Sequence, residues 1–120
     1  MRRLLAVIVI VGLAAVVVAC GDDDDDSEGS SARPELTAEQ RADPALVTGE
    51  SVYADQCARC HGVGGRGLNG PALVGIEETY PDLADQIAVI EVGRSGMPAF
   101  GARLSADDIE AVARYEREVL

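Results

Sequence analysis

Two thiols separated by two residues, with a histidine directly after the second, form the most reactive pattern in this 120-residue chain. The run is Cys57-Ala58-Arg59-Cys60-His61, and His61 is the only histidine of the sequence. A Cys-x-x-Cys-His run is the attachment pattern of a c-type haem. Each sulfur can bond a vinyl-derived carbon of the porphyrin, and the adjacent imidazole can ligate the iron. The pattern therefore predicts one covalently bound haem c per chain.

Other roles for the cysteine pair fit the sequence less well. A thioredoxin-like redox pair requires a βαβ context, and no strand-like alternation surrounds the motif. A structural zinc site needs four ligands, whereas the chain offers one pair, one histidine and Cys20. A plain disulfide between Cys57 and Cys60 would leave His61 without a role. Haem attachment is the interpretation that uses all three side chains.

A second axial ligand for the iron is predicted at Met97. The chain has two methionines, and the other one is Met1, in the N-terminal leader. Met97 lies in the loop-like run Gly96-Met97-Pro98-Ala99-Phe100, well separated in sequence from His61. A thioether is a soft ligand, and a Met/His pair raises the reduction potential. The ordinary alternative is a methionine of the core or the surface. We expect His61 and Met97 to be the two metal ligands.

The first 19 residues have the pattern of an export signal. Arg2 and Arg3 are followed by an apolar run from Leu4 to Ala19, and Cys20 comes next. This layout resembles a bacterial lipoprotein signal, in which Cys20 would carry the lipid. An uncleaved membrane helix is the alternative, although the run is shorter than the roughly 20 residues that a spanning helix needs. Both interpretations place the chain on the periplasmic side of the bacterial cytoplasmic membrane.

Residues 20–44 are predicted to be the lipidated cysteine and an acidic, disordered tether. Asp22 through Asp26 are consecutive acids, followed by serine, glutamate and glycine. Such a run repels itself and buries nothing. Residues 35–42 can form a transient helix, which the Asp43-Pro44 pair would end. A flexible linker of this length has a reach of roughly 25–30 Å.

Residues 45–120 are predicted to be an all-α domain of three to four helices with glycine-rich loops around the haem. The first helix is expected from Ala45 or Val47 to Ala58, with Leu46, Val52 and Tyr53 in the core. A second helix is expected between Pro81 and Gly93, because apolar residues recur there at helical spacing. These apolar residues are Leu83, Ile87 and Ile90.

The last helix has the clearest sequence signals. Ser105 is a good N-cap, and Asp108 three residues later resembles the second half of a capping box. Apolar residues then recur at helical spacing and form one face. They are Ile109, Val112, Ala113, Tyr115, Val119 and Leu120.

Three motifs in a fixed order resemble those of a small bacterial class I c-type cytochrome with one haem. The resemblance covers residues 49–120, and the last predicted helix contributes Tyr115. The motifs are Cys57-Ala58-Arg59-Cys60-His61-Gly62, Gly70-Pro71-Ala72-Leu73 and Gly96-Met97-Pro98-Ala99-Phe100.

The resemblance implies further contacts in a cytochrome c fold. The Pro71 carbonyl would accept a hydrogen bond from the distal nitrogen of His61, which fixes the ring and tunes its basicity. Leu73 and Phe100 would pack on the haem. The first and last helices would cross near Gly49, Tyr53 and Tyr115.

Two filled axial positions leave no iron site for a substrate. We therefore expect no enzyme but a membrane-tethered, mono-haem, one-electron carrier in a respiratory or photosynthetic chain. Two alternatives stay open: a haem subunit of a larger oxidoreductase complex, and a catalytic or gas-sensing haem domain with a weak methionine ligand.

Charge adds a statement about partners. Acidic residues outnumber arginines in residues 45–120, and lysine is absent from the chain, so nucleic acid is an improbable partner. We expect redox proteins as donor and acceptor, in membrane complexes, and the membrane itself through the lipid anchor. Arg59, Arg66, Arg94 and Arg103 lie in segments expected near the haem. The acidic residues, interpreted as surface groups, are Glu50, Asp55, Glu77, Glu78, Asp82, Asp85, Glu91, Asp107, Asp108, Glu110, Glu116 and Glu118.

Overall fold

A computed structural model describes residues 32–120 of the chain. The predicted signal at residues 1–19, the lipidated Cys20 and the acidic run that follows lie outside these residues. No helix within residues 32–120 is long and apolar enough to cross a membrane.

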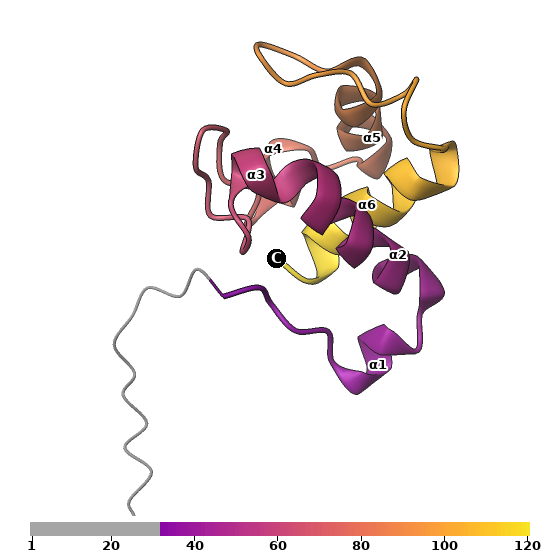
Figure 1. The fold of residues 1–120 in the computed structure, drawn as a ribbon. Coiled ribbons are helices and arrows are strands. Elements are labelled where there is room, and N and C mark those ends of the chain that lie inside the picture. The colour runs from indigo at the N-terminus through magenta and orange to yellow at the C-terminus, as the bar shows by residue number, and fades with distance from the viewer. Residues whose placement is uncertain (1–31) are drawn as a thin grey trace, which may run out of the picture.

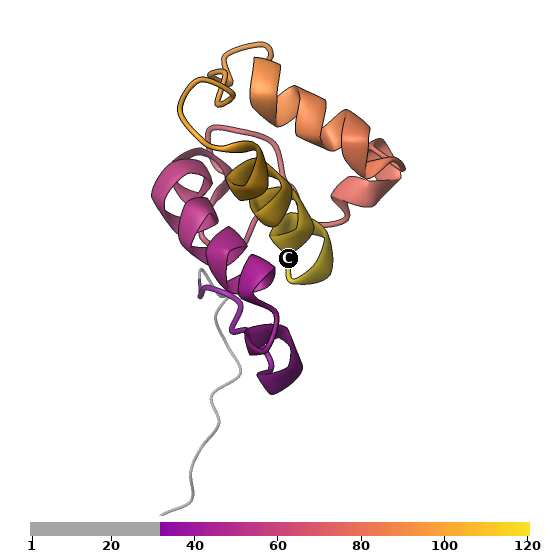
Figure 2. The ribbon, with the colours of Figure 1, turned by 90° about the vertical axis from the view of Figure 1, so that its right-hand side faces the viewer.

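Helices and loops make up the described part of the chain, as Figures 1 and 2 show, and this confirms the all-α prediction. Residues 32–120 contain no strand; one isolated β-bridge joins Arg94 and Met97. In chain order the elements are α1 (Ala38–Arg41), α2 (Pro44–Val52), η1 (Tyr53–Cys57), α3 (Ala58–His61), α4 (Ile76–Thr79), α5 (Leu83–Val92) and α6 (Ala106–Glu118).

The segments α2, η1 and α3 follow one another without a break and carry the Cys-x-x-Cys-His run at their end. The side chain of Asp43 accepts from the amide of Ala45 at 2.9 Å, and Pro44 occupies the first turn. In the middle, η1 is a wider π-helical turn, a form that is frequent at functional sites. The helix extends to His61, one turn beyond the predicted end at Ala58.

The contact between α2 and α6 is the centre of the fold. A Cβ atom on Gly49 would lie 2.2 Å from the carbonyl oxygen of Ala111 and 2.8 Å from Cβ of Tyr115. The two helices can therefore come this close only because position 49 has no side chain. Next to it, the rings of Tyr53 and Tyr115 lie 5.5 Å apart. The helix crossing that the resemblance implied is present.

The predicted features of α6 are confirmed. The Ser105 side chain accepts from the amide of Asp108, and the Asp108 side chain accepts from the amide of Ser105, which completes a capping box. Four members of the predicted apolar face are buried, and the last two pack against the core at partial exposure. The buried members are Ile109, Val112, Ala113 and Tyr115.

The second predicted helix is α5, and Gly93, which has a φ of 70°, ends it. Ile90 is buried, whereas Leu83 and Ile87 pack against the core at partial exposure. The short helix α4 was not predicted, because four residues are too few to show a helical period.

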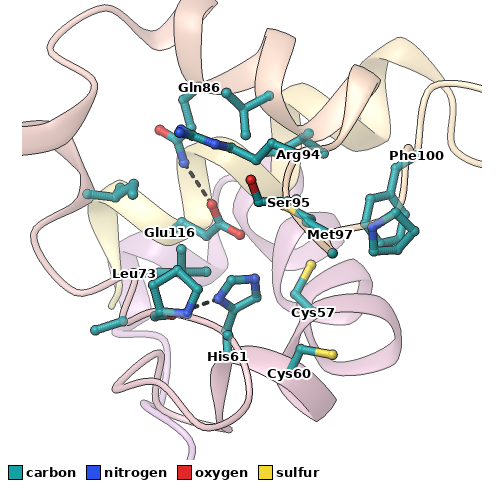
Figure 3. A pocket seen from close by; sticks show the side chains of 18 of the residues that line it. Cys57, Cys60, His61, Leu73, Gln86, Arg94, Ser95, Met97, Phe100 and Glu116 are labelled. Atoms are coloured by element: carbon teal, nitrogen blue, oxygen red, sulfur yellow. Dashed lines mark hydrogen bonds between the residues drawn. The ribbon is translucent and has the colours of Figure 1, made fainter.

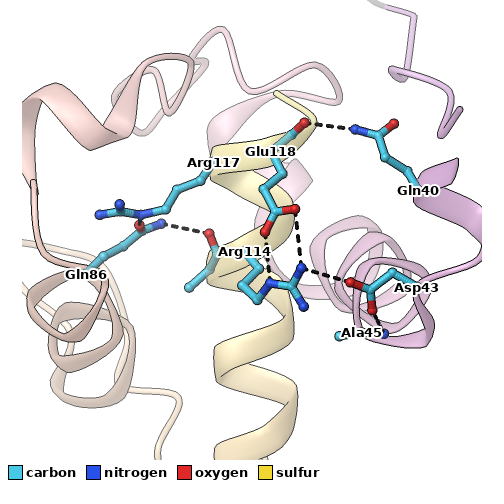
Figure 4. Close-up of polar contacts among 8 residues, drawn as sticks. Gln40, Asp43, Ala45, Gln86, Arg114, Arg117 and Glu118 are labelled. Carbon is cyan, nitrogen blue, oxygen red and sulfur yellow. Dashed lines mark hydrogen bonds and ion pairs between the residues drawn. The ribbon is translucent and has the colours of Figure 1, made fainter.

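The predicted tether ends earlier than residue 44. Leu36 is only 4% exposed and belongs to the same apolar core as Tyr115. Arg114 forms an ion pair with Asp43 at 2.8 Å, and Gln40 donates to the carbonyl of Glu118 at 2.9 Å (Figure 4). The guanidinium of Arg114 also lowers the pKa of the Asp43 carboxyl.

Residues 36–43 are ordered for a local and a tertiary reason. Thr37 caps α1 through a capping box with Gln40, so the helix is more than transient. The apolar side chain of Leu36 then finds a place in the core, and burial of one leucine is worth about 2 kcal/mol. Residues 36–43 are therefore part of the folded body.

Candidate haem site

A cavity of about 550 Å³ lies between η1, α3, α5, α6 and the loops that join them (Figure 3). Its volume is within the range of ligand and cofactor pockets in proteins. Every residue that the sequence suggested for the cofactor lines this one cavity. These residues are Cys57, Cys60, His61, Pro71, Leu73, Met97 and Phe100.

His61 is positioned at the C-terminal end of α3 and is 7% exposed. Its Nδ1 lies 2.8 Å from the carbonyl oxygen of Pro71. Because a carbonyl oxygen can only accept, Nδ1 must carry the proton, and Nε2 is left with a free lone pair. Such a bond from the distal nitrogen is the usual way to orient a metal-binding histidine. Gly70 lets the loop come close, since a Cβ there would lie 3.0 Å from Cε1 of His61.

Cys57 and Cys60 form no disulfide with each other in the described part of the chain, so both sulfurs are available to a cofactor. Cys57 is buried and Cys60 is partly exposed. Burial raises the pKa of the Cys57 thiol to about 12, so the group is protonated at neutral pH. The two sulfurs border the same cavity as the imidazole of His61 (Figure 3).

The loop between α5 and α6 holds Met97 at the cavity. Arg94 and Met97 exchange backbone hydrogen bonds of 2.7 and 3.2 Å, which close a tight turn. The amide of Phe100 donates to the carbonyl of Ile90 at 3.0 Å, and the Phe100 side chain is 3% exposed. The loop is therefore fixed on both sides of Met97.

Apolar side chains form much of the remaining cavity wall, among them Leu73, Ile76, Ile90 and Phe100. The guanidinium of Arg103 lies 5.2 Å from the centre of the Phe100 ring and covers it from outside. Two thiols, an imidazole with a free Nε2, a thioether and an apolar wall form a donor set that fits a covalently bound haem.

Glu116 is the cavity residue that the sequence interpretation placed wrongly. It was counted among the surface acids, but it is 5% exposed and lines the cavity. The helical spacing contained the signal, since position 116 follows Ile109 by seven residues and Val112 by four. Gln86 of α5, which is 3% exposed, was also missed; its amide donates to the Glu116 carboxylate at 2.7 Å.

Comparisons with known proteins agree with this arrangement. The model of the family described as "Cytochrome C oxidase, cbb3-type, subunit III" matches residues 44–115. The chain is 39% identical over 71 residues to cytochrome c6 of Microcystis aeruginosa. The matched region covers 56% of the chain and 88% of that protein. It is also 39% identical over 100 residues to the cbb3-type cytochrome c oxidase subunit FixP of Bradyrhizobium diazoefficiens, covering 68% of the chain and 34% of that subunit.

Two solved structures have a similar fold. Cytochrome cL of Methylophaga aminisulfidivorans superposes with a TM-score of 0.56 at 32% identity, covering 68% of this chain and 57% of that one. Cytochrome cL of Hyphomicrobium denitrificans superposes with a TM-score of 0.53 at 26% identity, covering 60% of this chain and 45% of that one. The chain thus spans about half the length of these two proteins.

The fold, the cavity and the comparisons define a c-type cytochrome with an all-α cytochrome c fold, whose cofactor is covalently bound haem c. More narrowly, the chain belongs to the family of the cbb3-type cytochrome c oxidase subunit III.

Proposed function

We propose that this cytochrome is an exported one-electron carrier whose haem iron has both axial positions filled. The observation that carries the proposal is that His61 and Met97, from separate elements, line one cavity with Cys57 and Cys60. When bound, haem supplies reversible exchange of one electron between ferric and ferrous iron. The protein residues would fix the ring, supply its two axial ligands and exclude water.

Cys57 and Cys60 would form the two thioether bonds, and their place on one continuous helical segment defines the orientation of the ring. His61 would donate the lone pair of Nε2, because Pro71 accepts the Nδ1 proton. Met97 would supply the second axial ligand from its fixed loop. With His61 and Met97 as ligands, the iron would have no open site for oxygen or peroxide.

The apolar wall supports a high reduction potential. Leu73 and Phe100 are at most 9% exposed and border the cavity. Apolar surroundings disfavour the extra positive charge of ferric iron, and a methionine ligand acts in the same direction. Both effects suit a carrier that accepts electrons from a stronger reductant and passes them on.

The relatives support two forms of this function. Cytochrome c6 of Microcystis aeruginosa is a relative that the chain covers over most of its length. The match to the oxidase subunit family and to FixP favours the second candidate, a haem subunit that passes electrons within a larger oxidoreductase. Extraction in mild detergent followed by size-exclusion chromatography separates the two, since a free carrier elutes as a single chain.

Export and membrane attachment are part of the proposal. Cys20 would carry the lipid on the periplasmic side of the membrane, and residues 21–35 would link it to the folded body. Because residues 36–43 are docked, the link is shorter than the sequence suggested. Partners would be redox proteins in the same membrane.

The absorption spectrum of the ferric protein tests the axial ligands. We expect a low-spin spectrum with a sulfur-to-iron charge-transfer band, and no rapid binding of carbon monoxide by the ferrous protein. Met97→Leu should keep the covalent haem, lose the band, lower the potential and bind carbon monoxide. A high-spin wild-type spectrum, or a variant with unchanged potential, would favour the catalytic or gas-sensing alternative.

A further inference from the structure

A glutamate side chain lines the cavity that would hold the haem. Glu116 is 5% exposed and lines the cavity together with Cys57, His61 and Met97 (Figure 3). Glutamate is almost never fully buried without a partner, because the charged form loses its hydration. A leucine at this position of α6 would serve packing alone. The presence of an acid here calls for a functional explanation.

The hydrogen bonds around Glu116 are directional. Gln86 Nε2 donates to Glu116 Oε2 at 2.7 Å (Figure 3). The other end of the same amide, Gln86 Oε1, accepts from Nε of Arg117 at 2.6 Å; Figure 4 shows Gln86 next to Arg117. Arg117 is held in turn by the carbonyls of Tyr80 and Pro81. Since Arg117 can only donate, the amide of Gln86 must present its NH₂ group to Glu116.

Gln86 is neutral, so it stabilises Glu116 without cancelling its charge. Within residues 32–120, Gln86 is the one hydrogen-bond partner of the Glu116 side chain, and no ion pair includes Glu116. Burial raises the pKa of Glu116 to about 7, and the Gln86 hydrogen bond opposes this increase. Both protonation states are therefore populated near neutral pH.

Other titratable and charged groups lie near Glu116. Burial raises the pKa values of Tyr53 and Cys57 on η1, so both are neutral. His61 uses Nδ1 for the Pro71 carbonyl, and the Arg117 guanidinium contacts Gln86 and not Glu116. The remaining charged groups on the packed elements and at the cavity rim are at least partly exposed. They are Glu50 on α2, Asp55 on η1, Arg59 on α3, Glu77 and Glu78 on α4, Asp85 and Glu91 on α5, and Arg94.

We propose that Glu116 is a proton-binding site coupled to reduction of the haem. Ferric haem with a Glu116 carboxylate takes up one electron from a redox donor protein and one proton from water. The products are ferrous haem and a Glu116 carboxylic acid, with the proton on a carboxyl oxygen. No other bond forms or breaks. The inference rests on the proposed function, because it needs a haem that exchanges electrons reversibly.

The coupling follows from electrostatics. An added electron in the cavity makes a nearby carboxylate less favourable and draws a proton onto it. By reciprocity, ionised Glu116 favours the ferric state and lowers the reduction potential. The low dielectric of the cavity keeps this interaction from being screened by water.

The reduction potential of the holoprotein, measured from pH 5 to 9 by spectroelectrochemical titration, tests the proposal. The wild-type potential should fall as pH rises through neutrality. Its limiting slope is a tenfold change of the reduction equilibrium constant per pH unit, which is 59 mV for a one-electron couple. Glu116→Gln should remove the slope and keep the potential near the low-pH wild-type value.

The control is Glu78→Gln, on the exposed face of α4, which should keep the wild-type slope. A flat wild-type profile, or an equal slope in Glu116→Gln, would overturn the proposal and assign any proton to another group. A reversible one-electron wave without pH dependence would refute the role of Glu116 and leave the proposed electron-carrier function standing. The absence of a reversible one-electron wave refutes the proposed function as well.

Two measurements on the wild-type holoprotein need no variant. Reduction in weak buffer at pH 7 should consume a measurable fraction of one proton per electron. The infrared difference spectrum of reduction should show a new band of a protonated carboxyl group. If neither proton uptake nor the band occurs, the proposal is wrong, even where Glu116→Gln fails to fold.

Discussion

Substitution of Gly49 by alanine tests the helix crossing on which the cavity depends. The new Cβ would lie 2.2 Å from the carbonyl oxygen of Ala111, whereas ordinary contact begins at 3.4 Å. The obstructing atoms belong to backbone and to Cβ of Tyr115, so a rotamer change cannot relieve them. The α2 and α6 helices would have to move apart by roughly 1 Å, in a core that is close-packed.

Two effects of opposite sign determine how much Gly49→Ala changes the free energy of unfolding. Overpacking of this kind costs about 3 kcal/mol, at the upper end of its range, because the obstructing atoms belong to backbone. The higher helix propensity of alanine relative to glycine stabilises the helix by about 1 kcal/mol. The net destabilisation is about 2 kcal/mol, and for a domain of this size that lowers Tm by roughly 8–16 °C.

Thermal unfolding of the ferric holoprotein, followed by circular dichroism and by the Soret band, measures this change. Gly64→Ala is the matched control, because a Cβ there would lie 3.4 Å from its nearest neighbour, the carbonyl of Ala32. It removes the same backbone freedom from the unfolded chain, which changes stability by at most about 1 kcal/mol. If Gly49→Ala melts at or above the temperature of Gly64→Ala, the reasoning about the crossing is wrong.

Three further predictions concern other contacts. Tyr53→Phe should cost about 1 kcal/mol, because the Tyr53 hydroxyl donates to the Gly62 carbonyl at 2.7 Å. Tyr115→Phe should cost nothing, because the buried Tyr115 hydroxyl has no hydrogen-bond partner within residues 32–120. Urea unfolding of both variants checks this, and equal losses would contradict it. Leu36→Ala should cost about 2–3 kcal/mol in the same assay, against less than about 0.5 kcal/mol for exposed Leu68→Ala, and no loss would mean that residues 36–43 are a detached tether. Stability should fall as pH rises from about 4.5 to about 7, since the folded state holds the Glu116 proton more tightly than the unfolded state. The loss is about 3 kcal/mol at most. Urea midpoints across this range should be flatter in Glu116→Gln, and a wild-type stability that rises through the window would contradict the assignment.

Local signals in the sequence were enough to predict the elements that carry the cofactor. The Cys57 to His61 run, the Ser105 cap and the apolar period of α6 are each encoded within a few neighbouring residues. Met97 followed by elimination, since the only other methionine, Met1, lies in the predicted leader. The structure brings Cys57, Cys60, His61 and Met97 to one cavity.

Features that depend on tertiary contacts were missed. Nothing near Leu36 in the sequence indicates that the far end of α6 will receive residues 36–43. The π-helical turn η1 does not show in the residue types of Tyr53–Cys57. Glu116 was missed for a different reason: its residue type suggested solvent, although its helical position pointed to the core. For such a residue, the polar type predicts exposure to solvent, whereas the helical position predicts burial. Conflicts of this kind between local signals tend to occur at functional sites.

Protein-film voltammetry of the purified holoprotein, with and without oxygen, tests the central claim most directly. Iron ligated by both His61 and Met97 predicts one reversible one-electron wave that oxygen and hydrogen peroxide leave unchanged. A catalytic current on addition of either oxidant would show an open iron site, and would contradict the proposal that the chain is an electron carrier with both axial positions of the iron filled.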